Sequence, residues 1–323
     1  GYETTYDNWR DLVADERVQL FDNVGPNLLH AEPCIAAAKA GKHILCEKPL
    51  ARNAGEARQM LDAVTAAGVV HMCGFSYRFL PAIRLAKQVV DEGRLGRIFH
   101  FRARYQNPAL ADPALPMMWR MNRELAGTGA LGDFGSHLVD MARFLVGEPV
   151  AVSGDTKTFI RERRLPGEPG RTGEVTTDDA FTALIEFDSG ASGTLEGSKL
   201  CLGSLNRFEF EINGSDGSLQ FNLERLNELQ VYLKEDEKTG LAGYRTVQAL
   251  SANHPWVSRW WPRHAFGWDH AFVHEMAHLL DAIAGKGTVA PYGATFEDGY
   301  KAAVVCDAIL ASAENGSRVK VEY

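Results

Sequence analysis

Residues 43–75, HILCEKPLARNAGEARQMLDAVTAAGVVHMCGF, have the pattern of a strand, a helix and a second strand. The segments 43–47 and 69–75 have the length and composition of buried strands, and Gly68 is placed to end the helix between them. Strands that are apolar throughout and alternate with helices predict a parallel sheet covered on both faces. This stretch therefore predicts an α/β fold with a Rossmann-type parallel sheet.

The same alternation extends toward the N-terminus, where a strand is expected at 18–25 and an alanine-rich helix at 30–41. The series opens on a helix at 4–16, whereas a doubly wound nucleotide-binding sheet normally opens with a strand, a glycine-rich turn and a helix. We therefore expect residues 1–75 to form a partial dinucleotide-binding domain that lacks its first, glycine-rich βαβ unit. Truncation of the sequence explains this better than a true loss, because the candidate catalytic residues further along are intact.

The pattern changes after a helix at 81–96. Segments between 180 and 235 are strand-like and are separated by turns rich in Asp, Asn, Ser and Gly, which favours antiparallel hairpins. We expect residues 76–323 to form an α+β domain for substrate binding and oligomerisation, with a large, mostly antiparallel sheet and packed helices. The charged segment 161–171 is expected to be a solvated loop.

Composition limits the class of protein. The chain has 323 residues, of which 45% are hydrophobic, so it can hold two domains with substantial cores. Its net charge of -8 and its lack of a basic tract predict no binding to nucleic acid or to a membrane surface. Five scattered cysteines without a Cys-x-x-Cys pair are typical of a reducing compartment, and neither a signal peptide nor a membrane span is expected. The cytoplasm is the expected location.

The tripeptide Glu47-Lys48-Pro49 directly follows a predicted buried strand. The carboxyl ends of parallel strands open into the ligand crevice of an α/β sheet, so Lys48 would lie beside a ligand. Its ammonium group is a compact donor whose pKa shifts readily in proteins. A surface lysine after a strand is the alternative interpretation, and position alone does not separate the two.

A second candidate site is GTGALGDFGSHLVD, residues 127–140. Asp133 and His137 are four residues apart on a predicted helix, so they share one face. Histidine is well suited to take up a proton near neutral pH, and a neighbouring carboxylate can orient it or hold a substrate hydroxyl. The glycines around Asp133 would let a ligand approach the backbone. The alternative is an exposed Asp/His pair on a helix surface.

Five motifs carry a resemblance to a known family: PNLLHAE from residue 26, GKHILCEKPLA from residue 41, GFSYRF from residue 74, WR at 119–120 and GDFGSHLVD from residue 132. From about Tyr6 to its C-terminus the chain resembles the Gfo/Idh/MocA family of nicotinamide-dependent sugar and polyol dehydrogenases. The resemblance implies an oxidoreductase that uses NAD or NADP and interconverts a secondary hydroxyl and a ketone on a sugar, glycoside or cyclitol. Such hydride transfer needs a base and a positive group, so no metal is expected.

The resemblance also implies roles for individual residues. His137 would accept the hydroxyl proton, Lys48 would contact the reacting oxygen, and Asp133 would bind or orient the substrate. The residues implied to bind the cofactor are Pro26, Asn27, His30, Glu47, Lys48, Ser76, Trp119 and Arg120. The family often has asparagine at the position of Ser76.

Further substrate contacts are expected from two segments. Tyr105 and Asn107 end the strand before the catalytic region, and segment 254–270 concentrates aromatic rings and polar donors that suit a ring with many hydroxyls. The predicted substrate-binding residues are Lys48, Tyr105, Asn107, Asp133, His137, His264 and Trp268. The alternative for the tryptophans is packing against the sheet or a subunit interface.

Two other functions are kept as alternatives. HEMAH at 274–278 has the HExxH pattern of zinc peptidases, with Glu297 as a possible third ligand. The same helix carries an apolar face expected to pack within the second domain: Phe272, Met276, Leu279, Leu280 and Ile283. A non-catalytic sugar sensor that kept the pocket and lost the cofactor half is the other alternative. The expected partners are a sugar or polyol and further copies of the chain, as a dimer or tetramer.

Overall fold

The computed structural model describes residues 3–254, 256–257 and 260–323. In the first part of the chain a parallel sheet forms in the order β1-β2-β3. Its strands are β1 (Leu20–Asn23), β2 (His43–Cys46) and β3 (His71–Cys73), and its helices are α1 (Trp9–Ala14), α2 (Ala31–Lys39) and α3 (Ala54–Ala67). The predicted Rossmann-type parallel sheet is confirmed.

Helix α3 shows how local sequence sets an element. Asn53 begins the helix, because its side-chain oxygen accepts the backbone N–H of Glu56. Gly68 ends it with a φ of 64°, a left-handed conformation that glycine adopts readily. The spacing of its buried side chains gives one apolar face, which consists of Ala57, Met60 and Val64. Helices α2 and α8 (Phe296–Asn315) are its neighbours.

The larger sheet has nine strands within the described residues, in the order β13-β12-β11-β10-β4-β9-β8-β5-β14. All neighbouring strands are antiparallel except β4 and β9. The strands are β4 (Ile98–Gln106), β5 (Pro149–Lys157), β8 (Ala180–Phe187), β9 (Ser192–Ser198), β10 (Arg207–Gly214), β11 (Gly217–Asn222), β12 (Glu228–Leu233), β13 (Arg245–Gln248) and β14 (Val319–Lys320). The mostly antiparallel sheet of the second part is thus confirmed.

Residues alternate between the two faces of this sheet. In β8, Ala183 and Ile185 are buried, whereas Leu184 between them is 62% exposed. Helices α4 (Pro81–Asp91) and α6 (Ser136–Leu145) contact strands of this sheet, and the short helix α5 (Arg123–Ala126) precedes α6. One face of the sheet is therefore packed by helices, and the face that carries Leu184 is open.

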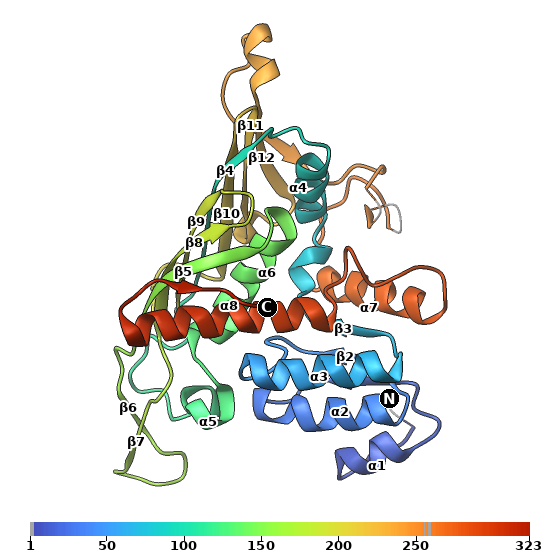
Figure 1. Ribbon diagram of the computed structural model, residues 1–323, viewed down its shortest axis with the longest axis vertical. Helices are drawn as coiled ribbons and strands as arrows, with labels where there is room; N and C mark the ends of the chain where they lie inside the picture. Colours follow the sequence, from blue (N-terminus) through green and yellow to red (C-terminus); the bar gives the residue numbers. More distant parts are fainter. Residues whose placement is uncertain (1–2, 255, 258–259) are drawn as a thin grey trace.

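Helix α8 (Phe296–Asn315) lies between the two sheets, with α3 on one side and β5 on the other (Figure 1). The N–H of Cys73 donates to the carbonyl of Ala294 over 2.8 Å, and the N–H of Phe296 donates to His71 Nδ1 over 3.1 Å. The C-terminal segment therefore packs directly on the first sheet. The division of the chain at residues 75 and 76 stays a prediction.

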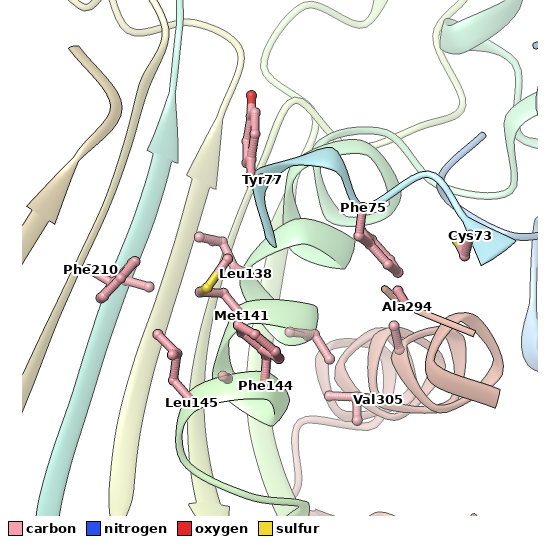
Figure 2. Close-up of a cluster of buried hydrophobic side chains, with 14 of the residues drawn as sticks. Cys73, Phe75, Tyr77, Leu138, Met141, Phe144, Leu145, Phe210, Ala294 and Val305 are labelled. Atoms are coloured by element: carbon pink, nitrogen blue, oxygen red, sulfur yellow. The ribbon is translucent and has the colours of Figure 1, made fainter. Parts of the chain in front are cut away.

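A continuous hydrophobic core fills the space between the large sheet, α6 and α8 (Figure 2). Side chains of α6 project from both sides of the helix, so that some face the strands and others face α8. The labelled members of this core are Cys73, Phe75, Tyr77, Leu138, Met141, Phe144, Leu145, Phe210, Ala294 and Val305. Because α6 is packed on two sides, the side chains at its start are held in fixed positions.

The prediction of a solvated loop at 161–171 is wrong for part of this segment. It contributes to a hairpin of β6 (Glu162–Arg164) and β7 (Thr172–Glu174), and Arg163 is only 1% exposed. The guanidinium of Arg163 donates to the carbonyl of Leu110 over 2.6 Å. Carbonyls of a distant loop, those of Leu110 and Asp112, accept from its two terminal nitrogens, and the local charge pattern does not reveal such partners.

Helix α7 (His270–Ile283) packs at the junction of the two parts. Its Leu279 lies in a buried cluster with Leu45 and Met72 of the first sheet. Leu280, which was predicted to belong to the apolar face, is 48% exposed. The helix therefore meets the first sheet as well as the second part of the chain.

The cysteines are free thiols, and all except the half-buried Cys201 are buried. Among the helices of the described ranges, none has the length and apolar content needed to span a bilayer.

Candidate active site

A cavity of about 270 Å³ opens where β1 and β2 end. The loops that follow these strands form one side, and the segment that leads into α6 forms the other. Residues from both sides line it, among them Gly25, Glu47, Lys48, Arg120, Asp133 and Lys199. The carboxyl ends of parallel strands are where open α/β sheets bind ligands. Lys48 therefore borders a cavity, and the surface-lysine interpretation does not apply.

Three charged side chains meet at this cavity. Lys48 Nζ lies 2.5 Å from Asp133 Oδ1 and 3.2 Å from the backbone carbonyl of Asp133. Lys199 Nζ lies 3.1 Å from the other carboxylate oxygen, Oδ2. Lys48 follows β2, Lys199 follows β9, and Asp133 lies in the π-helical turn η4 (Leu131–Gly135) before α6. One carboxylate thus joins lysines that follow strands of the two sheets.

Burial and ion pairing oppose each other in this cluster. Burial raises the pKa of Asp133, but Lys48 and Lys199 outweigh that effect and hold the pKa of the carboxyl well below its usual range. Burial lowers the pKa of Lys48, and Asp133 more than offsets it, so the pKa of Lys48 is raised. Asp133 and Lys48 are therefore both charged at neutral pH.

His137 follows one helical turn after Asp133 and is 6% exposed. Its ring stacks on Tyr77, with centroids 4.5 Å apart, and Phe75 meets it edge-on. Burial, and then the charge of Lys48, hold the pKa of His137 well below its ordinary value. The imidazole is therefore neutral at pH 7, the state that can accept a proton.

Backbone packing fixes the turn that carries Asp133. The Asp178 carboxylate accepts the N–H groups of Gly129 over 2.6 Å and Leu131 over 2.7 Å. A Cβ atom on Gly129 would lie 1.9 Å from the carbonyl oxygen of Asp178. Glycine is required here because neighbouring backbone approaches closely, and Gly129 also lines the cavity, where the sequence predicts that glycine lets a ligand approach the backbone.

The residues predicted to bind the cofactor separate into two groups. Those that line the cavity are Asn27, Glu47, Lys48, Trp119 and Arg120. Pro26 lies next to them at the start of η1 (Asn27–Leu29). Their contacts with a cofactor stay a prediction.

His30 and Ser76 form the second group, because both are buried and neither lines the cavity. The ring nitrogens of His30 lie 2.9 Å from the carbonyl of Gly25 and 2.9 Å from that of Pro49. His30 therefore ties the loop after β1 to the loop after β2.

The predicted substrate residue Tyr105 lies beside the helix that carries His137, with the two ring centroids 5.8 Å apart. Its hydroxyl is 2.7 Å from the hydroxyl of Tyr77, and its ring stacks on Phe134 with centroids 4.2 Å apart. Asn107, by contrast, accepts the N–H of Ala109 over 3.0 Å, and neither Tyr105 nor Asn107 lines the cavity. The structure thus brings Tyr105, and not Asn107, to the catalytic cluster.

The structure does not bring His264 and Trp268 to the cavity. Both lie in the exposed segment before α7, where Trp268 meets Phe272 edge-on. Within segment 254–270, Trp256 is 5% exposed, which agrees with the packing interpretation for this residue, whereas Trp260, Trp261 and Trp268 are 41%, 79% and 47% exposed. Residues 255, 258 and 259 of this segment lie outside the described residues.

Two residues beside Asp133 and His137 were not predicted from the sequence, namely Tyr77 and Lys199. Strands β4 and β9 pair in parallel, with Gln106 opposite Ser198, so Lys199 lies beside the end of β4. A lysine at the carboxyl end of a predicted strand was an available signal. The expectation of antiparallel hairpins alone gave no reason to place that strand end beside Asp133.

The HExxH histidines are engaged within the protein. His274 Nε2 accepts the indole N–H of Trp260 over 2.7 Å, and His274 Nδ1 lies 3.1 Å from the carbonyl of Phe79. His278 Nε2 lies 2.8 Å from the carbonyl of Val289. These bonds use the ring nitrogens that a metal would need.

The other HExxH elements also have structural surroundings. Burial raises the pKa of Glu275 well above its usual value, and Glu297 pairs with Lys301 over 3.1 Å. In the described ranges no three ligand-type side chains are grouped to hold a metal ion. The metallopeptidase alternative is not supported.

Family comparisons give matches in both parts of the chain. A model described as an oxidoreductase family with an NAD-binding Rossmann fold matches residues 1–75. A model described as the GFO/IDH/MocA C-terminal domain matches residues 83–220.

Individual relatives and solved structures extend these matches. Levoglucosan dehydrogenase of Pseudarthrobacter phenanthrenivorans is 42% identical over 334 residues, which cover 99% of this chain and 84% of that protein. Myo-inositol 2-dehydrogenase of Thermotoga maritima is 30% identical over 220 residues, covering 68% of this chain and 61% of that protein. The structure of levoglucosan dehydrogenase with NADH and levoglucosan has a TM-score of 0.94 and 42% identity, and covers 100% of this chain and 85% of that chain.

Proposed function

This chain belongs to the Gfo/Idh/MocA family of NAD-binding oxidoreductases, and we propose that it oxidises one secondary hydroxyl of a sugar, glycoside or cyclitol to a ketone. The observation that carries the proposal is the Lys48–Asp133 ion pair at 2.5 Å, one helical turn from the buried His137, beside a cavity at the strand ends. Levoglucosan is the first substrate to test, because a similar protein is a dehydrogenase of that sugar. NAD is the first cofactor to test, because the family whose model matches residues 1–75 is described as having an NAD-binding Rossmann fold.

The residues around the cavity fit a nicotinamide cofactor. Loop residues after β1 and β2 line it, at the edge where open α/β sheets hold dinucleotides. Asn27 and Glu47 would hold polar groups of the cofactor. Arg120, whose guanidinium lies 4.2 Å from the ring centroid of Trp119, would offer positive charge to its phosphates. When bound, the nicotinamide supplies the acceptor for the hydride of the substrate carbon.

The protein side chains would handle the proton and the charge. Neutral His137 accepts the hydroxyl proton as the C–H bond of the same carbon breaks. Lys48 stabilises the negative charge that develops on the oxygen, because its ammonium is held beside the cavity by Asp133. In the reverse direction protonated His137 returns the proton to the oxygen.

Substrate tests decide the proposal. We expect the full-length protein to reduce NAD or NADP with at least one compound from a panel of levoglucosan, myo-inositol, D-xylose and alkyl glucosides. The absorbance of the reduced nicotinamide measures the rate, and a reaction without sugar is the control. No reduction of either cofactor with any member of the panel, by protein that is folded, would contradict the proposal.

The open face of the large sheet is proposed to bind a second copy of the chain. A groove of about 1200 Å³ runs over this face, and its outward side chains carry both signs of charge: Arg102, Arg104, Arg207, Glu209, Glu211 and Glu228. Within the chain Arg104 and Arg207 pair with Glu209, and Arg102 lies 3.7 Å from Glu211. A face that carries both signs of charge can also pair with itself across a twofold axis. The exposed Leu184 lies in the same groove and supplies apolar contact area.

Leu184→Arg tests this interface. The added charge faces its own symmetry mate or an apolar patch, so we expect the mass measured by light scattering to fall by half relative to the wild type. Val273→Arg is the matched control, since Val273 is 48% exposed on α7 and outside this groove. A wild-type monomer, or equal masses for the wild type and Leu184→Arg, would argue against the dimer.

A further inference from the structure

Lys199 has a place in the active site that the proposed mechanism does not use. Its side chain is 4% exposed, and its ammonium lies 3.1 Å from Asp133 Oδ2. The same ammonium lies 5.4 Å from the ring centroid of Phe134. A buried ammonium is costly unless it is paired, and Asp133 already has Lys48 as a partner on its other oxygen. A second lysine at one carboxylate is therefore more than charge compensation.

The backbone of Lys199 is fixed on both sides. Its N–H donates to the carbonyl of Asp179 over 3.0 Å, and its carbonyl accepts the N–H of Leu110 over 3.0 Å. The preceding residue, Ser198, is in register with Gln106 of β4. The ammonium is thus presented to Asp133 from a rigid strand end, and not from a flexible surface loop.

We propose that Lys199 is a positioning residue. Its ammonium group holds the Asp133 carboxylate on the side opposite Lys48. In this way it orients the Lys48 side chain and sets the electrostatic environment of His137. The proposal rests on the proposed dehydrogenase function for its kinetic consequence. Oδ2 held by Lys199 leaves Oδ1 on Lys48, so the carboxylate cannot rotate. The two lysines and one carboxylate also leave one net positive charge in the cluster. Without Lys199 the carboxylate would neutralise Lys48 alone.

The surroundings of His137 allow this charge to be detected. Lys48 and Asp133 are the charged groups that act on it directly, and Lys199 reaches it through its ion pair with Asp133. The hydroxyl-bearing rings near His137 are Tyr77 and Tyr105. Removal of one positive charge from the cluster makes protonation of His137 easier. Lys199→Met keeps the length and apolar stem of the side chain and removes only the ammonium.

The first test is an NMR titration of 13C-labelled histidine rings in the protein without cofactor, with His137→Gln to assign the signal. We expect Lys199→Met to raise the pKa of His137 by roughly one pH unit, as expected for a nearby charge at an effective dielectric constant of about 20. Lys157→Met is the matched control, because Lys157 pairs with Asp155 on the surface. An unchanged His137 pKa in Lys199→Met would overturn the proposed electrostatic role.

The second test is a double-mutant cycle on kcat with Asp133→Asn. We expect Lys199→Met to lower kcat roughly 10- to 100-fold in the wild type and less than about 2-fold in Asp133→Asn, because its effect passes through the carboxylate. Equal effects in both backgrounds would show a merely structural role. If Lys199→Met does not fold, Lys199→Gln replaces it in both tests. If the wild type oxidises no sugar, the proposed function fails, and the titration still decides the role of Lys199.

Discussion

His137→Ala is expected to lower kcat for sugar oxidation by roughly 100- to 10,000-fold, the usual contribution of a positioned general base. The imidazole is buried and its pKa is held well below the ordinary value, so it is neutral at pH 7, as the proposed acceptor of the hydroxyl proton must be. Lys48→Ala is expected to cause a loss of similar size, because it removes the charge that stabilises the developing alkoxide. Steady-state rates at saturating sugar and cofactor measure both effects.

Two comparisons make this prediction specific. Lys87→Ala removes a lysine that is also paired with an aspartate, Asp91, but on the surface of α4, and it should leave kcat unchanged. His264→Ala should also have little effect, because His264 is exposed and does not line the cavity. Near-normal rates in both His137→Ala and Lys48→Ala, with unchanged melting temperatures, would refute the mechanism.

Asp140→Asn is expected to lower the free energy of unfolding by up to about 3–5 kcal/mol, the usual cost of breaking a buried ion pair, because Arg78 then keeps only its longer contact with Asp298 at 3.4 Å. Asp140 and Arg78 form two hydrogen bonds, of 3.0 and 2.5 Å, and both side chains are almost fully buried. The Arg78 guanidinium also lies 4.7 Å from the ring centroid of Phe144, within the core shown in Figure 2. The pair fastens η2 (Ser76–Phe79) to α6, which begins at the catalytic turn.

Asp62→Asn is the matched control for stability. Asp62 pairs with Arg58 over 2.9 Å on the surface of α3, and exposed pairs of this kind contribute below about 1 kcal/mol. Urea unfolding, monitored by circular dichroism, measures the free energy of unfolding of both variants. The two values are compared with the same dependence of that free energy on urea concentration. A loss in Asp140→Asn no larger than in Asp62→Asn would mean that the buried pair contributes little to the stability of the fold.

Much of the fold could be predicted because the signals are local. The apolar runs of β2 and β3, the cap at Asn53 and the glycine that ends α3 act over a few residues. Strands β5, β13 and β14 and the hairpin of β6 and β7 had no such signal. Arg163 in that hairpin looks like a solvated charge in the sequence, and its carbonyl partners come from a distant loop.

The catalytic candidates divide in the same way. Lys48, Asp133 and His137 could be named from motifs, because strand ends and helical spacing place them predictably. Lys199 could not be named from a motif. It follows a predicted strand, but its contact with Asp133 depends on the parallel pairing of β4 with β9. The HExxH pattern suggested a zinc site as an alternative, but its first histidine contacts the carbonyl of Phe79, which is distant in the sequence.

The sequence by itself determined the class of the fold, which follows from the spacing of apolar residues along single strands and helices. Its motifs also carried the resemblance that implied the family and the roles of Lys48, Asp133 and His137. Only the tertiary structure decided which lysines share the Asp133 carboxylate and which glycine is approached closely by neighbouring backbone. It also decided which histidines form hydrogen bonds within the protein. The physical reason is that these contacts join segments tens to hundreds of residues apart. Their geometry is set by how the two sheets and α8 pack, and not by any local preference of the chain.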